Sequence, residues 1–485
     1  MECMSDLPPP PPSAPAGSRR AALVAWIFAV LGFVAIVVSQ HVVLPGEKEA
    51  KEHEAPSALV PPSSDDPDLQ SAKLSVKLNA LFKGQGQDTG AMLMGMGVEP
   101  HTDPVAAFRQ AILAAELTGA KDAGARLDKI DLAAKTDLGR PLNEGERDRF
   151  QGEIASVRKI LDGRGEALAE AEKAALIDDH GWYARLAFSL GKPERDPARA
   201  SITAGGAGVI AFVFLVLGIL VVALVGGLTA FIVAIVLGAR GRLRANYRPA
   251  TPTGSVAIET VAVFFVAFLL LQVVGEWLLP KVGLGIGARL SLQWLLALVP
   301  LWPLVRGMPL ATWRERIGWT APRGVAREIG AGIFAYFAGL PLLAVAVAIA
   351  MLILLVQSAL SGGQFERPHN PVQEILGAAS PGVLVLLFLL ATLWAPFVEE
   401  SVFRGALFAQ LRPRVGVWLA AIITGVVFGM MHGYPLPLLL PVITLGFCFA
   451  LTREWRSSLL ASMTGHFLHN ATLLTLGIMI SHVTR

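Results

Sequence analysis

The sequence predicts an all-α fold: a polytopic transmembrane helical bundle of about nine spans with a small helical extramembrane domain. Of its 485 residues, 53% are hydrophobic and only 16% are charged, whereas soluble globular domains carry about 25% charged residues. Apolar stretches near the length that crosses a bilayer, about 20 residues, recur along the chain. Arginine clusters separate these stretches and set their orientation. The net charge of +3 gives no reason to expect nucleic acid as a partner.

The N-terminal region predicts a tail and an anchor. Residues 1–20 contain the proline run Pro8–Pro12 and are expected to be a disordered tail. Residues 21–44 begin with an apolar stretch that lacks a small-residue cleavage site after it, so we expect an uncleaved transmembrane anchor. Arg19 and Arg20 precede this anchor and predict a cytoplasmic N-terminus.

Residues 45–200 differ in composition and predict a helical extracytoplasmic domain with a linker. The linker, residues 55–68, is rich in Pro, Ser and Asp. Beyond it, Val105, Phe108, Ile112 and Leu113 repeat with helical spacing after an Asp-Pro start that suits a helix N-terminus. A spacer or a docking surface is the expected role, and the sequence does not identify a partner for this domain.

Residues 201–250 predict one transmembrane span and a basic loop. The apolar stretch Ile202–Leu237 is long for a single span, and Gly226-Gly227 is compatible with a kink or a re-entrant turn. We favour one span because an arginine cluster follows directly and marks the cytoplasmic side.

Residues 251–485 predict seven further spans. With the anchor and the span before them they make nine, and this count places every basic cluster on one side of the membrane. The seven expected spans are Val256–Leu279, Leu290–Val305, Ala331–Val356, Pro381–Val398, Val415–Met431, Leu436–Leu451 and Leu459–Ile480. The two cysteines, Cys3 and Cys448, cannot build a disulfide framework.

The segment Trp394–Arg404 places charges at the end of an apolar run. Glu400 and Arg404 are four residues apart, so they share a helix face and can pair, while Glu399 has no partner in its own segment. Such charges cost about 2.5–3.5 kcal/mol each at the bilayer centre and little at the interface, where the helix could simply end. Two later apolar segments also carry polar groups, namely His432 in the first and His466, His469 and Asn470 in the second.

These residues predict a shared hydrolytic site. A carboxylate beside an imidazole can take a proton from water, and Asn470 can donate to an oxyanion. Alternatively, Glu399, His432 and His466 could bind Zn²⁺ with a water in the fourth position. Both arrangements lead to peptide-bond hydrolysis without a covalent intermediate. The H-E-x-x-H motif, the rhomboid-like G-x-S-G motif and the presenilin-like G-x-G-D motif are all absent from the sequence.

Three motifs together resemble the CAAX-prenyl protease and bacteriocin-processing (CPBP) family, also called the abortive-infection family. They are E-E-x-x-x-R at Glu399–Arg404, F-x-x-x-H at Phe428–His432 and H-x-x-x-N at His466–Asn470. The resemblance implies that residues 251–485 are a membrane protease core whose cavity opens toward the cytosol. It also implies that Glu399 and His432 position the water, that Glu400 and Arg404 belong to the site, and that His466 and Asn470 contribute to it.

The leading hypothesis is therefore an intramembrane endopeptidase of CAAX-protease type, either a metalloprotease or a metal-independent glutamate protease. Its expected partners are membrane lipid and a peptide or protein substrate, lipidated or membrane-tethered. We expect a multi-pass protein of a bacterial inner membrane. A non-catalytic scaffold or bacteriocin self-immunity protein is the alternative, and a proton-relay transporter is the third hypothesis, although no internal hydropathy repeat supports transport.

Overall fold

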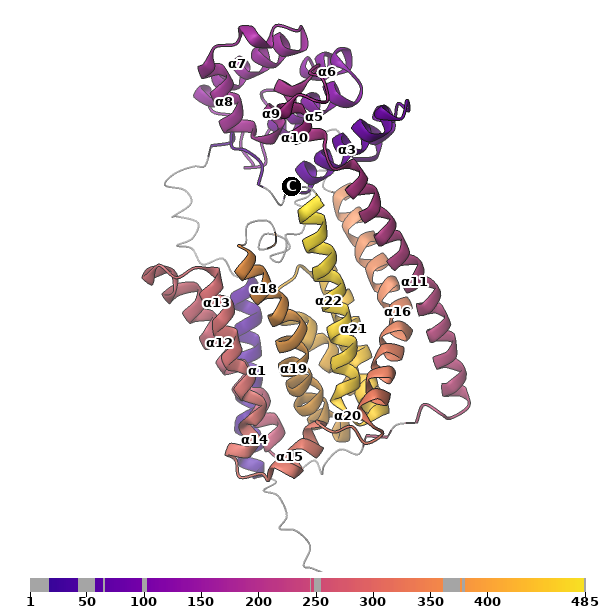
Figure 1. Ribbon diagram of the computed structural model, residues 1–485. Helices are drawn as coiled ribbons and strands as arrows, with labels where there is room; N and C mark the ends of the chain where they lie inside the picture. The colour runs from indigo at the N-terminus through magenta and orange to yellow at the C-terminus, as the bar shows by residue number, and fades with distance from the viewer. Residues whose placement is uncertain are drawn as a thin grey trace, which may run out of the picture. The chain divides into compact units, whose positions relative to one another are not determined.

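The computed structural model describes residues 17–41, 57–63, 66–97, 103–244, 246–247, 254–360, 376 and 380–483 (Figure 1). Helices account for 80% of the residues, and the part of the chain that the structure describes contains no strand, which confirms the helical fold class. The proline run of the N-terminal tail, the first part of the predicted linker and most of the loop before Pro381 lie outside the described residues.

The described residues form mainly α-helices. The α-helices are α1 (Arg19–His41), α3 (Pro67–Gly84), α4 (Gly90–Gly97), α5 (Pro104–Leu117), α6 (Ala120–Leu127), α7 (Glu144–Leu161), α8 (Glu170–His180), α9 (Trp182–Ser189), α10 (Pro197–Thr203), α11 (Gly206–Ala239), α12 (Val256–Val273), α13 (Ile286–Leu292), α14 (Trp302–Val305), α15 (Leu310–Ile317), α16 (Val325–Leu360), α18 (Pro381–Leu389), α19 (Ala395–Glu399), α20 (Phe408–Met430), α21 (Leu436–Arg456) and α22 (Leu459–Val483). Three π-helical stretches interrupt them at Val274–Leu278, Leu390–Trp394 and Glu400–Leu407.

Seven helical segments of the described residues are long and apolar enough to cross a membrane, fewer than the nine expected. One reason is that Pro381–Met430 counts as a single segment of 50 residues, although Gly416, with a φ of 81°, breaks its helical backbone where the sequence separates two spans. The other is that α22 is not among the seven. Its polar residues include His466, His469 and Asn470.

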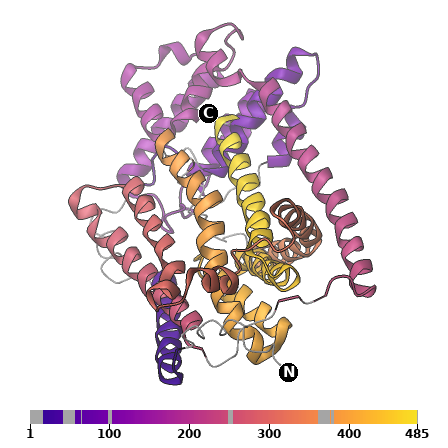
Figure 2. The same ribbon diagram turned by 60° about the horizontal axis from the view of Figure 1, so that its bottom comes forward.

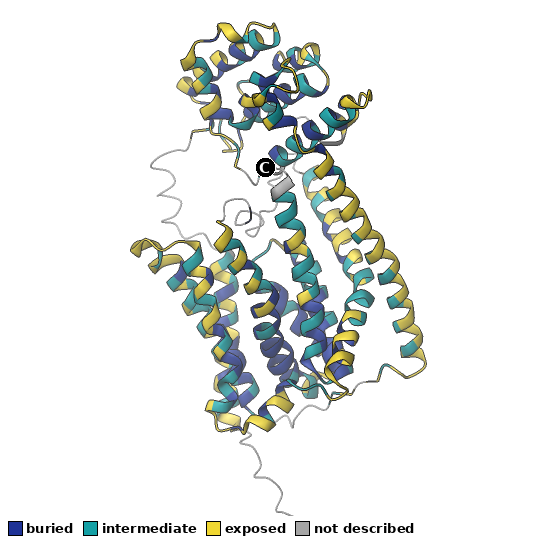
Figure 3. Ribbon diagram, in the orientation of Figure 1, coloured by how far each residue is buried: buried dark blue, intermediate teal, exposed yellow. Residues whose placement is uncertain are grey.

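The first of two compact units comprises residues 1–43, 219–371 and 379–475. Helix α1 packs along α12, and α21 packs against both α20 and α16 (Figures 1 and 2). The core of this unit is apolar and includes Ile36, Phe265, Val398, Phe403 and Phe428. Figure 3 shows the buried residues gathered on α19 and α20, at the centre of the bundle. The predicted charged segment therefore occupies the interior of the bundle rather than its surface.

Helix α11 is one continuous helix, as the sequence analysis favours, without a kink at its glycine pair. Within the first unit this pair faces α16 closely: a Cβ atom at Gly226 would lie 3.1 Å from the Phe337 ring, and one at Gly227 would lie 3.2 Å from the Leu340 side chain. Small residues allow such close approach of two membrane helices. The pair therefore serves helix packing rather than a turn.

A buried ion pair joins α16 to α21. Arg456 donates from Nε and Nη2 to the two carboxylate oxygens of Glu328, at 2.8 and 2.9 Å. Glu328 has no exposed surface, and Arg456 is 8% exposed. Because each charge compensates the other, neither helix carries an unpaired charge into the core at this point.

The second unit comprises residues 44–218, 372–378 and 476–485, and its described part is mostly the helices α3 to α10. Helix α5 begins as the sequence predicts: Asp103 accepts N–H bonds from Val105 and Ala106, and Pro104 occupies the first turn. The predicted apolar face of α5 is buried with Phe150 in one core. The segment is thus a small helical bundle with its own hydrophobic interior.

Candidate active site

The first candidate segment lies between two π-helical stretches. Leu390–Trp394 and Glu400–Leu407 flank the short helix α19, whose first turn contains Pro396. π-Helical turns are rare and frequently occur at functional sites. This irregular backbone carries Glu399 and Glu400 into the middle of the bundle.

Glu400 and Arg404 form the ion pair that their spacing predicts. Arg404 Nη1 donates to Glu400 Oε1 at 2.8 Å, and both side chains are fully buried. Arg404 Nη2 donates to the Gly446 carbonyl at 3.0 Å, and its guanidinium lies over the rings of Phe428 and Phe449 at 4.4 and 5.2 Å. The guanidinium thus places a positive charge directly beside the buried carboxylate of Glu400.

His466 of α22 lies between the two carboxylates. Its Nδ1 is 3.1 Å from Glu400 Oε1, and its Nε2 is 3.8 Å from Glu399 Oε2. Because an ionised carboxylate can only accept, we assign the proton to Nδ1, which leaves the lone pair of Nε2 toward Glu399. The ring stacks on Phe449 with centroids 5.3 Å apart and an interplanar angle of 23°. The carboxylate and the aromatic ring together orient the imidazole.

Glu399 is less constrained than Glu400. It is 17% exposed at its side chain, and its Oε2 is buried without a hydrogen-bond partner in the described structure. A distance of 3.8 Å to His466 Nε2 is too long for a direct hydrogen bond. A water that contacts both atoms would satisfy each of them.

His432 is held by its own helix. Its Nδ1 bonds the carbonyl of Phe428, four residues earlier, at 2.9 Å. Among the described residues, the ion pairs of this site join His466, and not His432, to the two glutamates. The family resemblance implies that Glu399 and His432 position the water, whereas the imidazole within 4 Å of Glu399 in the described structure is that of His466.

Asn470 follows His466 by one helical turn and faces the first π-helical stretch. Its Nδ2 donates to the carbonyl of Ala391 at 2.8 Å. One of its two amide N–H groups is therefore bound to the protein backbone.

Residues 381–472 match the family model described as type II CAAX prenyl endopeptidase, Rce1-like. This segment is Rce1-like. The match includes all six predicted site residues and confirms the resemblance to the CPBP family that the motifs indicate. No curated protein and no solved structure matches the chain. With its apolar helices, the chain is an integral membrane protein.

The donors of the Rce1-like segment do not form a metal site in this arrangement. Within the described ranges, no group of three or more His, Cys, Asp or Glu residues lies in a position to hold a metal ion. Both ring nitrogens of His466 face carboxylates, and His432 Nδ1 is bound to a backbone carbonyl. As placed, Glu399, His432 and His466 therefore do not form a ligand group for Zn²⁺.

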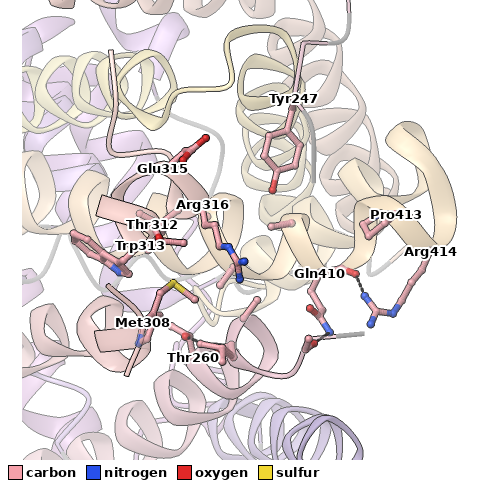
Figure 4. Close-up of a pocket in the computed structure, with 18 residues that line it drawn as sticks. Tyr247, Thr260, Met308, Thr312, Trp313, Glu315, Arg316, Gln410, Pro413 and Arg414 are labelled. Carbon is pink, nitrogen blue, oxygen red and sulfur yellow. Dashed lines mark hydrogen bonds between the residues drawn. The ribbon is translucent and has the colours of Figure 1, made fainter. Parts of the chain in front are cut away.

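A cavity of about 430 Å³ lies beside the Rce1-like site rather than in it (Figure 4). None of the six predicted site residues lines it, but Gly405 and Ala406, which directly follow Arg404, form part of its wall. Trp313, Arg316 and Gln410 also line it. The cavity is built from α12, the α14–α15 region and α20, so no single sequence motif could have indicated it.

Two contacts of the site have no counterpart in the motifs. Phe449 is an ordinary apolar residue of α21 in the sequence, yet it contacts both His466 and Arg404. Trp319 donates from Nε1 to Ser401 Oγ at 3.0 Å and packs on Phe397 with ring centroids 4.3 Å apart. Both contacts depend on tertiary packing, which helical periodicity does not reveal.

Proposed function

We propose that the chain is an intramembrane endopeptidase that hydrolyses a peptide bond of a membrane-tethered peptide or protein, using a water activated by Glu399 and His466. The observation that supports it is the position of His466 between the two glutamates, 3.1 Å from Glu400 and 3.8 Å from Glu399. The Rce1-like match over residues 381–472 supports a protease of the CAAX type in general terms.

The charged neighbours of the two glutamates give them different roles. Arg404 keeps Glu400 ionised, and Glu400 in turn keeps the proton on His466 Nδ1. Glu399 has no cationic partner at hydrogen-bond distance among the described residues, and its Oε2 is unpartnered. Glu399 is therefore the group that is available to accept a proton, whereas Glu400 orients the imidazole.

The proposed reaction begins with a water between Glu399 Oε2 and His466 Nε2. The water gives one proton to Glu399 while its oxygen attacks the carbonyl carbon of the scissile peptide bond, which forms a tetrahedral oxyanion. Glu399 then passes this proton to the leaving nitrogen as the C–N bond breaks. The immediate products are a carboxylic acid and an amine, and proton transfer from the acid to the amine gives a carboxylate and an ammonium group.

Substituting the proposed base tests this function. Glu399→Gln is expected to lower the cleavage rate of a membrane-tethered reporter by about 10²-fold or more, because general-base catalysis contributes about 10²–10⁴-fold. Glu276→Gln is the matched control, since Glu276 pairs with Arg289 outside the site. Unfolding midpoints in detergent establish that both variants are folded. If Glu399→Gln cleaves the reporter like the unmodified protein, the proposal is wrong and a scaffold role becomes the better explanation.

Metal dependence is tested separately. Because Glu399, His432 and His466 do not form a ligand group, we expect cleavage to persist in the presence of a strong chelator. Metal analysis of the purified protein is expected to give far less than one zinc per chain. Stoichiometric zinc, together with loss of cleavage on chelation and its return on adding zinc, would contradict the metal-free mechanism.

A further inference from the structure

The inference starts from a missing backbone donor in the segment before Glu399. In the π-helical stretch, the N–H of Ala395 donates to the carbonyl of Leu390, five residues earlier. In the same register, the next carbonyl is that of Ala391, and its donor would be the N–H of residue 396. That residue is Pro396, which has no N–H. The sequence therefore removes the backbone partner of one carbonyl in a partly buried stretch of the bundle.

Asn470 supplies the missing donor. Its Nδ2 lies 2.8 Å from the Ala391 carbonyl oxygen, a normal hydrogen-bond distance. A carbonyl without a donor is costly inside a membrane protein because no water replaces the bond. The bond thus has a structural reason that is independent of any substrate, and it joins α22 to the stretch that precedes the two glutamates.

The same helix carries the imidazole of the site. His466 is one turn before Asn470, and its contacts with Glu400 and Glu399 are 3.1 and 3.8 Å long. A shift of α22 by one residue is about 1.5 Å along the helix axis, which is enough to break the first contact and to change the second. The register of α22 against the glutamate-bearing segment therefore decides whether His466 faces both carboxylates.

We propose that Asn470 is a positioning residue, which replaces the N–H missing at Pro396 and so holds His466 in register with Glu399 and Glu400. Its effect on cleavage rests on the proposed function, whereas its effect on the helix register does not. In this view, Pro396 and Asn470 are coupled although 74 residues separate them in the sequence (470 − 396).

A double-mutant cycle tests the coupling. Pro396→Ala restores a backbone N–H toward Ala391, so it is expected to change reporter cleavage by less than about threefold. Asn470→Ala alone is expected to lower cleavage by about tenfold or more, but by less than about threefold in the Pro396→Ala background. Pro441→Ala is the control, because Pro441 also lies inside a helix of the bundle, α21, but has no part in this link. In the Pro441→Ala background, Asn470→Ala is expected to lower reporter cleavage by the same factor as in the wild-type chain.

Two outcomes separate this proposal from a direct role for Asn470 at the reacting oxygen. If Asn470 acted only as an oxyanion donor, its removal would cost the same factor in the wild-type chain and in the Pro396→Ala variant. Equal losses in these two backgrounds therefore overturn the positioning role. A non-additive loss with Pro396→Ala, together with an additive loss with Pro441→Ala, supports it.

A measurement without substrate keeps the inference independent of the proposed protease activity. The ¹⁵N signal of His466 reports the Nδ1–H bond to Glu400. We expect this signature to change in Asn470→Ala and to return in the double variant with Pro396→Ala. An unchanged His466 signal in Asn470→Ala overturns the positioning role, even if the wild-type chain cleaves no reporter or neither Pro396 variant folds. A changed signal in a chain without cleavage would leave the positioning role standing and reject the proposed function.

Discussion

Arg404 has no exposed surface, and its guanidinium faces a carboxylate, a backbone carbonyl and two aromatic rings. A cation can be buried only where such groups replace its hydration. These partners come from three places: Glu400 is one turn away, Phe428 belongs to α20, and Gly446 and Phe449 belong to α21. Arg404 therefore holds two helices of the bundle together as well as the charge of Glu400.

Truncating this arginine should destabilise the bundle strongly. Arg404→Ala leaves Glu400 buried without a compensating charge, and breaking such a pair costs about 3–5 kcal/mol. Arg126→Ala provides the comparison, since Arg126 pairs with Asp122 at the surface and exposed pairs contribute at most about 1 kcal/mol. Denaturant unfolding in detergent micelles measures both. Similar losses for the two variants would show that the Glu400–Arg404 pair is not buried as described.

Phe449 should matter through the ring of His466. Phe449→Leu keeps an apolar side chain but removes the flat surface on which the imidazole stacks. We expect lower reporter cleavage with little change in substrate affinity, because Phe449 orients a catalytic group. Phe449→Tyr should restore cleavage, and Phe447→Leu, in the same helix, serves as the control. A loss of affinity alone, with the rate of the bound complex unchanged, would contradict the orienting role.

The residues of the site differ in how far the sequence predicts them. The spacing of Glu400 and Arg404 predicts their pairing because both lie on one helix, where geometry is local. The placement of His466 against Glu399, in preference to His432, depends on how three helices pack. Helical periodicity carries no information about that packing.

At the level of elements, the second unit contains a buried cluster of ionisable side chains between α7 and α8. His180 Nε2 lies 3.0 Å from Glu153 Oε2, and Arg149 pairs with Asp179 at 2.6 Å. Burial and the neighbouring Glu153 raise the pKa of Asp179 from 3.8 to about 7. Burial and the nearby Arg109 lower the pKa of His180 from 6.5 to about 3. Burial also raises the pKa of Glu153.

The pKa shifts of Asp179 and His180 make the free energy of unfolding depend on pH in opposite directions. The folded unit binds a proton at Asp179 that the unfolded chain releases above 3.8, so this contribution is complete below 3.8 and is lost as the pH rises through about 7. The folded unit keeps His180 neutral, so its contribution is present above 6.5 and is lost as the pH falls toward about 3. Between about 4 and 6.5 the two slopes offset each other.

Asp179→Asn should expose the slope of His180. The amide does not titrate, so we expect the stability of the helical unit to rise from about pH 4 to 6.5 more steeply than in the wild type. Amide hydrogen exchange of α8 in the full-length chain, corrected for the intrinsic pH dependence of exchange, measures it. Asp162→Asn is the control, because Asp162 forms an exposed pair with Arg164. Equal pH slopes in Asp179→Asn and the wild type would contradict the assignment of Asp179.

Element boundaries are well predicted where local chemistry sets them. Asp103 and Pro104 fix the start of α5, because a capping carboxylate and a proline both favour a first turn. The π-helical stretches around Glu399 are not predictable in this way. Leu390–Trp394 is apolar whereas Glu400–Leu407 contains Glu400 and Arg404, so the two stretches share no sequence signal that marks the wider turn.

For the molecule as a whole, the arginine distribution predicts a cytoplasmic N-terminus and places residues 60–190 outside the cytoplasm. Single cysteines introduced at exposed positions test it in a variant without Cys3 and Cys448. A cysteine at Lys121, between Arg19 and the first arginine cluster after α11, is expected to react with a membrane-impermeant reagent added from outside. A cysteine at Arg314 is expected to stay protected in intact cells. The reverse pattern would invert the predicted topology.

The sequence predicts nine membrane spans, whereas seven helical segments of the described residues are long and apolar enough to cross a membrane. The sequence pattern separates Pro381–Val398 from Val415–Met431 and includes Leu459–Ile480 as a span. A count of long apolar helices in the structure merges the first two into one segment of 50 residues and leaves out α22. The two counts therefore differ because the helix continues across the polar stretch and because α22 carries several polar side chains.

The pair between Glu328 and Arg456 has a consequence for synthesis of the chain. The two residues are 128 positions apart in the sequence. Because ribosomes add about 5–20 residues per second, Arg456 is synthesised roughly 6 to 26 s after Glu328. During that time α16 has no cation in place to accompany its carboxylate into the bundle core. We expect a nascent chain that ends before residue 456 to keep Glu328 at the membrane surface, and α16 to reach its final depth only after α21 has been inserted.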